Sequence, residues 1–150
     1  MRNFTVGGGR TFRFWYTPDS VVVPVTMTWR CERWELGAFY FGRQYQRFDG
    51  ERHLVVRGDA AVSLTRRLIL HRWKSQDAFF GLGGSYRTKA GFEEGDPFNG
   101  NYLNFTEQVG VRWMRTDHRQ GIELSVRHFS NLGIVKPNIG QNFLVAAVVF

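Results

Sequence analysis

The sequence predicts an all-β fold, an eight-stranded antiparallel transmembrane β-barrel with short periplasmic turns and longer outer loops, in which residues 1–150 form a single domain. Three observations predict this fold. Eight segments alternate apolar and polar residues, as strands with two different faces do. The connections between these segments alternate between long and short. The last segment ends in an aromatic residue, Phe150, which is typical of bacterial outer-membrane barrels.

The first four strands are expected at about Asn3–Gly9, Val21–Cys31, Trp34–Arg43 and Ala61–Leu70. Each has apolar residues at every second position, which is the pattern of a strand with one apolar face. The second is the clearest, because its odd-numbered residues from 21 to 29 are Val, Val, Val, Met and Trp. The fourth has one exception, Arg66, on its apolar face. Helical periodicity is weak throughout the chain.

The last four strands are expected at about Ala78–Tyr86, Asn104–Trp113, Gly121–Ser130 and Asn142–Phe150. The sixth strand of the chain has an apolar face on which Glu107 is the odd member. The seventh and eighth form a hairpin whose apolar faces end in His128, Ser130 and Asn142. Polar residues at the end of an apolar face are the feature of this hairpin that requires an explanation.

The connections favour a membrane barrel over a soluble one. Long connections are expected at about 10–20, 46–59, 88–101 and 131–141, and short ones at about 32–33, 71–76 and 116–120. A soluble barrel has no reason to sort its connections in this way. Alternation alone does not decide, because a soluble ligand-binding barrel with its apolar face inside has the same periodicity. Tryptophans near strand ends favour the membrane, where they form interfacial girdles; they are Trp15, Trp29, Trp34, Trp73 and Trp113.

Composition excludes some functions. The net charge is +7, but the basic residues are dispersed rather than clustered with aromatics, so a nucleic-acid partner is not expected. A phosphorylated lipid surface fits the basic residues near loops, which are Arg10, Arg13, Arg47, Arg52, Arg57, Arg87 and Lys89. A single cysteine, Cys31, excludes an internal disulfide and argues against a metal cluster. Residues 1–5 lack the apolar stretch of a signal peptide, so an exported protein would be the mature form or lack its true start.

The polar end of the last hairpin has the residue types of a hydrolytic triad. His128 and Ser130 are two residues apart on one strand and so share a face, about 6.5–7 Å apart at Cα. Asn142 opens the returning strand beside them. A serine becomes a nucleophile when a base takes its proton, and an amide oxygen can orient that base. Taken alone, a His-x-Ser at a strand end also fits simple hydrogen bonding without catalysis.

The segments Arg127–Gly133 and Lys136–Gly140 give the chain a resemblance to a known family, the outer-membrane lipid A 3-O-deacylases of the PagL type, within the acyloxyacyl hydrolases. A weaker resemblance covers Phe79–Gly83 and Asn101–Phe105. The resemblance implies an eight-stranded barrel in the bacterial outer membrane, with catalytic residues on its outside. It implies a serine esterase that removes the 3-O-linked 3-hydroxyacyl chain of lipid A in lipopolysaccharide, without cofactor or metal.

Carried over by position, the resemblance makes Ser130 the nucleophile and His128 the general base. Asn131, Gly133 and Asn138 match positions linked to site geometry and to the oxyanion hole. The remaining triad position is Asn142, where the better-known members have a glutamate. A neutral amide orients the imidazole but does not offset its positive charge.

Because residue 142 is not an acid, the sequence leaves open whether another carboxylate assists His128 and whether the protein is catalytic. Glu107 is the acid expected near the outer end of an outward face, where it is either an auxiliary catalytic group or part of a site that binds cations between lipid phosphates. The alternative function is a non-catalytic structural or lipid-binding barrel of the outer membrane. A homodimer is also left open by the sequence.

Overall fold

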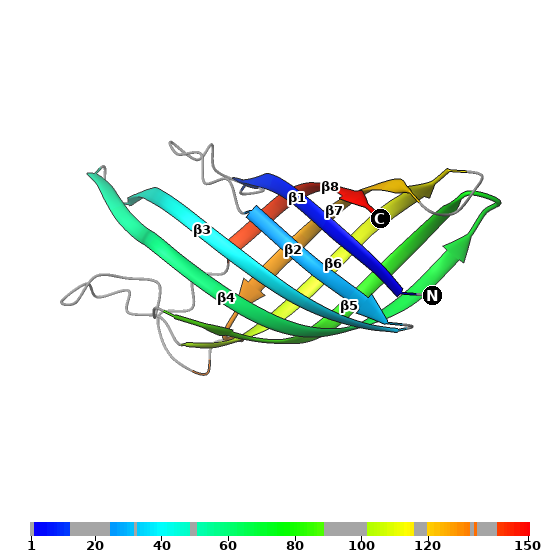
Figure 1. Ribbon diagram of the computed structural model, residues 1–150. Helices are drawn as coiled ribbons and strands as arrows, with labels where there is room; N and C mark the ends of the chain where they lie inside the picture. Colours follow the sequence, from blue (N-terminus) through cyan, green and yellow to red (C-terminus); the bar gives the residue numbers. More distant parts are fainter. Residues whose placement is uncertain are drawn as a thin grey trace.

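The protein forms a closed β-barrel in the computed structural model (Figure 1). The structure describes residues 2–12, 25–31, 33–48, 51–88, 102–115, 120–132, 134 and 141–150, with the backbone alone at positions 2, 11–12, 25–26, 43–48 and 52–57. The strands are β1 (Arg2–Phe12), β2 (Val25–Cys31), β3 (Trp34–Phe48), β4 (Glu51–Arg72), β5 (Gln76–Arg87), β6 (Leu103–Met114), β7 (Gly121–Ser130) and β8 (Gln141–Val149). Each strand pairs antiparallel with the next, and β8 pairs with β1. The predicted eight-stranded antiparallel barrel is confirmed.

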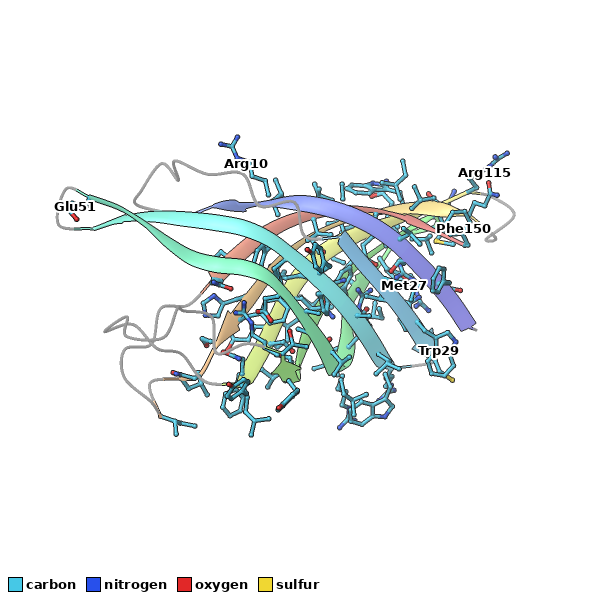
Figure 2. All side chains as sticks on the ribbon, turned by 60° about the vertical axis from the view of Figure 1, so that its left-hand side comes forward. Arg10, Met27, Trp29, Glu51, Arg115 and Phe150 are labelled. Atoms are coloured by element: carbon cyan, nitrogen blue, oxygen red, sulfur yellow. The ribbon has the colours of Figure 1, made fainter. Side chains whose placement is uncertain are left out.

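The two ends of the barrel differ. One end, here called the turn end, holds Arg33, the turn Trp73–Ser75 and both chain termini. The opposite end, the loop end, holds the tip of the β3–β4 hairpin near Glu51 and the start of β8 at Gln141 (Figures 1 and 2). β7 therefore runs from the turn end to the loop end.

The β3–β4 hairpin is longer than the sequence predicts. A long connection was expected at about 46–59, but β3 continues to Phe48 and β4 begins at Glu51, with Arg47 paired to Arg52. The prediction was wrong because this extension lacks the apolar face that marks the barrel strands. Figure 1 shows the hairpin projecting past the other strands at the loop end. In β2, the expected start at Val21 lies outside the described residues.

The barrel is apolar outside and polar inside. Along β4, Val62 and Leu64 are 55% and 53% exposed, whereas Ser63, Thr65 and Arg67 are buried. The other described strands repeat the alternation of exposed and buried positions, although on β8 the buried residues after Gln141 are apolar as well. Figure 2 shows Met27, Trp29 and Phe150 on the outer surface. The soluble alternative, which requires the apolar face inside, is wrong for the described part of the chain.

A network of paired charges fills the lumen toward the turn end. Arg67 Nη2 lies 2.5 Å from Glu35 Oε2 and 2.7 Å from Glu123 Oε1. Arg112 Nη2 lies 2.5 Å from Glu123 Oε2, and Arg127 Nη1 lies 3.1 Å from Glu35 Oε1. We call these five residues the luminal ion network. Buried charges are tolerated when each is paired and hydrogen-bonded.

Aromatic rings fill the lumen nearer the loop end. Phe39, Phe41, Phe129 and Phe143 are buried, with ring centroids 5.1–6.2 Å apart. Side chains thus occupy the described lumen, as in other barrels of eight strands. No helix in the described residues is long and apolar enough to cross a membrane.

Tryptophans gather at the turn end. Trp29, Trp34, Trp73 and Trp113 are 38–51% exposed and lie near strand ends or in a turn at that end. Trp15 lies outside the described residues. The positions of the other four match those of an interfacial aromatic girdle.

Candidate active site

The polar end of the last hairpin lies on the outer surface of the barrel. β7 begins at Gly121 and ends at Ser130, as expected, and its even-numbered residues face outward. β8 pairs with β7 in a register that places Asn142 directly opposite His128. Residues that are directly opposite in an antiparallel pair share a face, so both side chains lie on the outside of the barrel.

A hydrogen bond joins these two side chains. His128 Nδ1 and Asn142 Oδ1 are 2.7 Å apart, and both residues are half-buried. Because an amide oxygen only accepts hydrogen bonds, Nδ1 carries the hydrogen and donates it. The second ring nitrogen, Nε2, is then the unprotonated one in the neutral imidazole. Asn142 thereby fixes a tautomer in which His128 accepts a proton at Nε2.

Ser130 follows two residues after His128 on the same outward face. It is 4% exposed and lies opposite Phe105 of β6. Among the described residues no hydrogen bond joins Ser130 to His128, so that contact stays a prediction. Strand geometry nevertheless keeps the two side chains neighbours, since alternate residues of a strand are about 6.5–7 Å apart at Cα.

The backbone turns sharply after Ser130. Asn131 is buried, and its carbonyl oxygen accepts a hydrogen bond of 3.1 Å from the amide of Ile134. Leu132 between them has a φ of 52°, a backbone conformation that residues other than glycine rarely adopt. Of the residues expected to bind the oxyanion, Asn131 therefore lies next to Ser130, whereas Gly133 and Asn138 lie outside the described residues.

Glu107 lies on the other side of His128. In the β6–β7 register Glu107 is directly opposite His128, just as Asn142 is opposite His128 in the β7–β8 register. Glu107 is half-buried. His128 thus lies between an acid and an amide on the outward face, an arrangement that alternation within single strands does not reveal.

An apolar groove of about 600 Å³ adjoins this site on the outer surface. Phe105, which is opposite Ser130, and Ile134 form part of it, and Gly84 of β5 leaves its floor open. The other lining residues are Leu36, Val62, Ser63, Leu64, Ser85, Tyr86, Leu103 and Asn104. The sequence leads us to expect a groove for one acyl chain between His128 and neighbouring apolar side chains, but the groove found here lies beside that position, over β5 and Gly84.

The other histidine side chain that the structure describes lies away from the site. His71 packs against Trp73 at the turn end, with ring centroids 4.2 Å apart and the ring planes tilted by 53°. The described residues contain no group of three or more His, Cys, Asp or Glu able to hold a metal ion.

The basic residues expected near the loops separate into two groups. Arg10 is exposed, but Arg87 is buried and paired with Asp59 inside the barrel. The expectation that Arg87 faces a lipid surface is therefore wrong, because its position on β5 points it to the lumen. The side chains of Arg13, Arg47, Arg52, Arg57 and Lys89 lie outside the described residues.

Comparisons with known proteins agree with this fold. The structure is similar to the crystal structure of the outer membrane enzyme PagL, with a TM-score of 0.63, 14% identity, and coverage of 99% of this chain and 98% of that one. It is also similar to Neisserial surface protein A, with a TM-score of 0.57, 9% identity and coverage of 99% and 94%. For Ail of Yersinia pestis in a nanodisc the TM-score is 0.53, with 15% identity and coverage of 99% and 98%.

The sequence itself gives the family. A search of curated proteins found no match. The family model described as lipid A 3-O-deacylase (PagL) matches residues 20–150, which include every residue of the candidate site. The chain therefore belongs to the lipid A 3-O-deacylase (PagL) family.

Proposed function

We propose that this protein is a serine esterase of the bacterial outer membrane that hydrolyses the 3-O-linked 3-hydroxyacyl chain of lipid A. Ser130 is the nucleophile, His128 the general base, and Asn142 the group that orients His128. The observation that carries the proposal is the 2.7 Å hydrogen bond between His128 Nδ1 and Asn142 Oδ1, on the outward face and beside Ser130. Family membership supports the substrate.

The first half of the reaction forms an acyl-enzyme. Ser130 Oγ attacks the ester carbonyl carbon while His128 Nε2 takes the hydroxyl proton. The carbonyl oxygen becomes an oxyanion, which hydrogen-bond donors from Asn131, Gly133 and Asn138 stabilise. When the intermediate collapses, the bond from the carbonyl carbon to the sugar oxygen breaks, and His128 returns its proton to that oxygen.

The second half regenerates the enzyme. Water attacks the acyl-enzyme carbonyl carbon and gives one proton to His128 Nε2. The bond to Ser130 Oγ then breaks, and His128 protonates Oγ. The products are a 3-hydroxy fatty acid and lipid A with one free sugar hydroxyl. Throughout the cycle the Asn142 oxygen accepts the Nδ1 hydrogen and so keeps Nε2 directed at the reaction.

The apolar groove gives the released acyl chain a place to bind. It begins beside Phe105, opposite Ser130, and continues over β5, where Gly84 has no side chain. A hydrocarbon chain in the outer leaflet can exchange lipid contacts for contacts with this groove at little cost. Because Ser130 is only 4% exposed, the ester reaches Oγ only when neighbouring side chains move aside.

Mass spectrometry of lipid A tests the proposal. Refolded protein in detergent is incubated with lipopolysaccharide, beside Ser130→Ala and the matched control Ser125→Ala, which changes a buried luminal serine of the same strand. We expect wild type and Ser125→Ala to remove one 3-hydroxyacyl chain and Ser130→Ala to remove none. Deacylation that persists in Ser130→Ala contradicts the nucleophile.

The non-catalytic barrel predicts a different result. In that case neither wild type nor Ser130→Ala, both shown to be folded by circular dichroism, changes the lipid. Asn142 is the observation that favours this alternative, since a neutral group replaces an acid at the third triad position. The hydrogen bond that it forms to His128 favours the esterase.

A further inference from the structure

We propose that Glu107 is a positioning residue for His128, whose carboxylate offsets the positive charge that the imidazole acquires and that the neutral Asn142 leaves uncompensated. The inference rests on the proposed function, because it assigns a role within the same reaction. It concerns an acid on β6, a strand that supplies none of the three triad residues.

The register places the acid beside the base. Glu107 is directly opposite His128 across β6 and β7, and Asn142 is directly opposite His128 across β7 and β8. Directly opposite residues have Cβ atoms about 4.5–5.5 Å apart and point to the same face. His128 thus has an amide that bonds its Nδ1 on one side and a carboxylate on the other.

Among the described residues, the neighbouring strands offer Glu107 no basic partner other than His128. Leu82 is opposite it on β5, Phe105 and Val109 flank it on β6, and the positions beside His128 on β7 are Val126 and Ser130. Among these described positions there is no Lys or Arg, and His128 is the one other titratable residue. Among the described residues on this face, His128 is therefore the base beside the carboxylate.

A carboxylate on this outward face lowers the stability of the barrel unless another group compensates its charge. Acids on the lipid-facing surface of a barrel destabilise it, and an apolar residue would fit the pattern of the face. The reaction supplies the compensating charge, because His128 becomes an imidazolium each time it takes a proton. In a medium with little water, the attraction between two opposite charges is much stronger than at the same separation in bulk water.

Glu107 lies outside the path of the proton in the proposed reaction. The proton moves from Ser130 Oγ to His128 Nε2 and then to the leaving oxygen, while Nδ1 stays bonded to Asn142. Glu107 neither takes nor gives a proton in this scheme. Its effect is on the stability of the imidazolium, so it acts on turnover more than on substrate binding.

The test is Glu107→Gln, made both in the wild-type protein and in the Asn142→Glu variant. Glu107→Gln keeps the size and removes the charge, and we expect it to lower kcat about 10- to 100-fold with KM changed less than about threefold. The acidic limb of the pH profile of kcat/KM should move to lower pH, because an imidazolium without its carboxylate loses its proton more easily. A purely structural role for Glu107 would not shift this limb.

A carboxylate at residue 142 should make the charge of Glu107 dispensable. Asn142→Glu puts a carboxylate on the other side of His128, and in that background Glu107→Gln should cost less than about threefold. Val109→Gln is the matched control, because it places the same amide on the same face of β6 at a position that is 50% exposed and opposite Val126. It should retain wild-type kcat and an unshifted pH profile.

The outcomes separate the two proposals. An equal loss from Glu107→Gln in both backgrounds, or no loss in either, overturns the role of Glu107 while the Ser130→Ala result still stands. If wild type and Ser130→Ala behave alike, the proposed function fails, and the inference about Glu107 fails with it.

Discussion

The luminal ion network and the outward His128–Asn142 pair are two polar clusters in one barrel, and they differ in how fully their groups are paired. In the network, Glu123 receives contacts from Arg67, Arg112 and Arg127, all buried. On the outside, His128 donates one hydrogen bond to a neutral amide, and no other described residue forms a hydrogen bond with its ring.

The difference distinguishes polar groups that stabilise the fold from polar groups that act in a reaction. The ions of a barrel interior need partners of opposite charge, since a buried charge without one is expensive. The lipid-facing surface needs no polar group for stability at all. The proposed function gives the polar groups on this surface a chemical role, so breaking each cluster should damage a different property.

The largest effect is expected from breaking the network. Glu123→Gln leaves three arginines with one fewer carboxylate, and we expect it to lower the free energy of unfolding by about 3–5 kcal/mol. Urea unfolding in lipid bilayers measures the loss. The control is Asp77→Asn, which breaks an ion pair with Arg72, whose side chain is 69% exposed; this should cost under about 1 kcal/mol. Equal losses would mean that the network contributes no more than a surface pair.

The next effect tests the outward pair by turnover. Asn142→Ala removes the acceptor of the Nδ1 hydrogen, and we expect kcat to fall about 10- to 100-fold with the unfolding free energy within about 0.5 kcal/mol of wild type. Asn142→Glu should retain or raise kcat, because a carboxylate accepts the same hydrogen and adds charge. Unchanged turnover in Asn142→Ala would mean that another group orients His128.

A smaller effect is expected from filling the groove. Gly84 faces outward, and a Cβ atom there meets no atom closer than 3.9 Å, so Gly84→Leu should fold normally with its side chain in the groove. We expect kcat/KM for long-chain lipid A to fall about 5- to 10-fold, and less for a short-chain ester. Gly42→Leu, at another open glycine away from the groove, is the control. A loss that is independent of chain length would exclude the groove as the acyl site.

Alternation predicted which residues face in and out, but not which of them meet. A strand that slips by two residues keeps its faces and changes every partner, so periodicity leaves register undetermined. His128 and Ser130 were placed together because they are two residues apart on one strand. Glu107 opposite His128 depends on the β6–β7 register, which only the structure provides. The luminal pair of Glu35 and Arg127 joins strands far apart in the chain.

The smallest effect concerns the turn after the nucleophile. Leu132 has a φ of 52° and is 59% exposed, so it combines backbone strain with little burial. Asparagine tolerates this conformation better than leucine, and Leu132→Asn should raise the free energy of unfolding by about 0.5–1 kcal/mol. Turnover should stay within about twofold of wild type if the strain only shapes the chain. A marked fall in kcat with a gain in stability would instead mean that the Leu132 side chain itself holds Asn131 against the oxyanion, which would move part of the outward site from the strands into the turn.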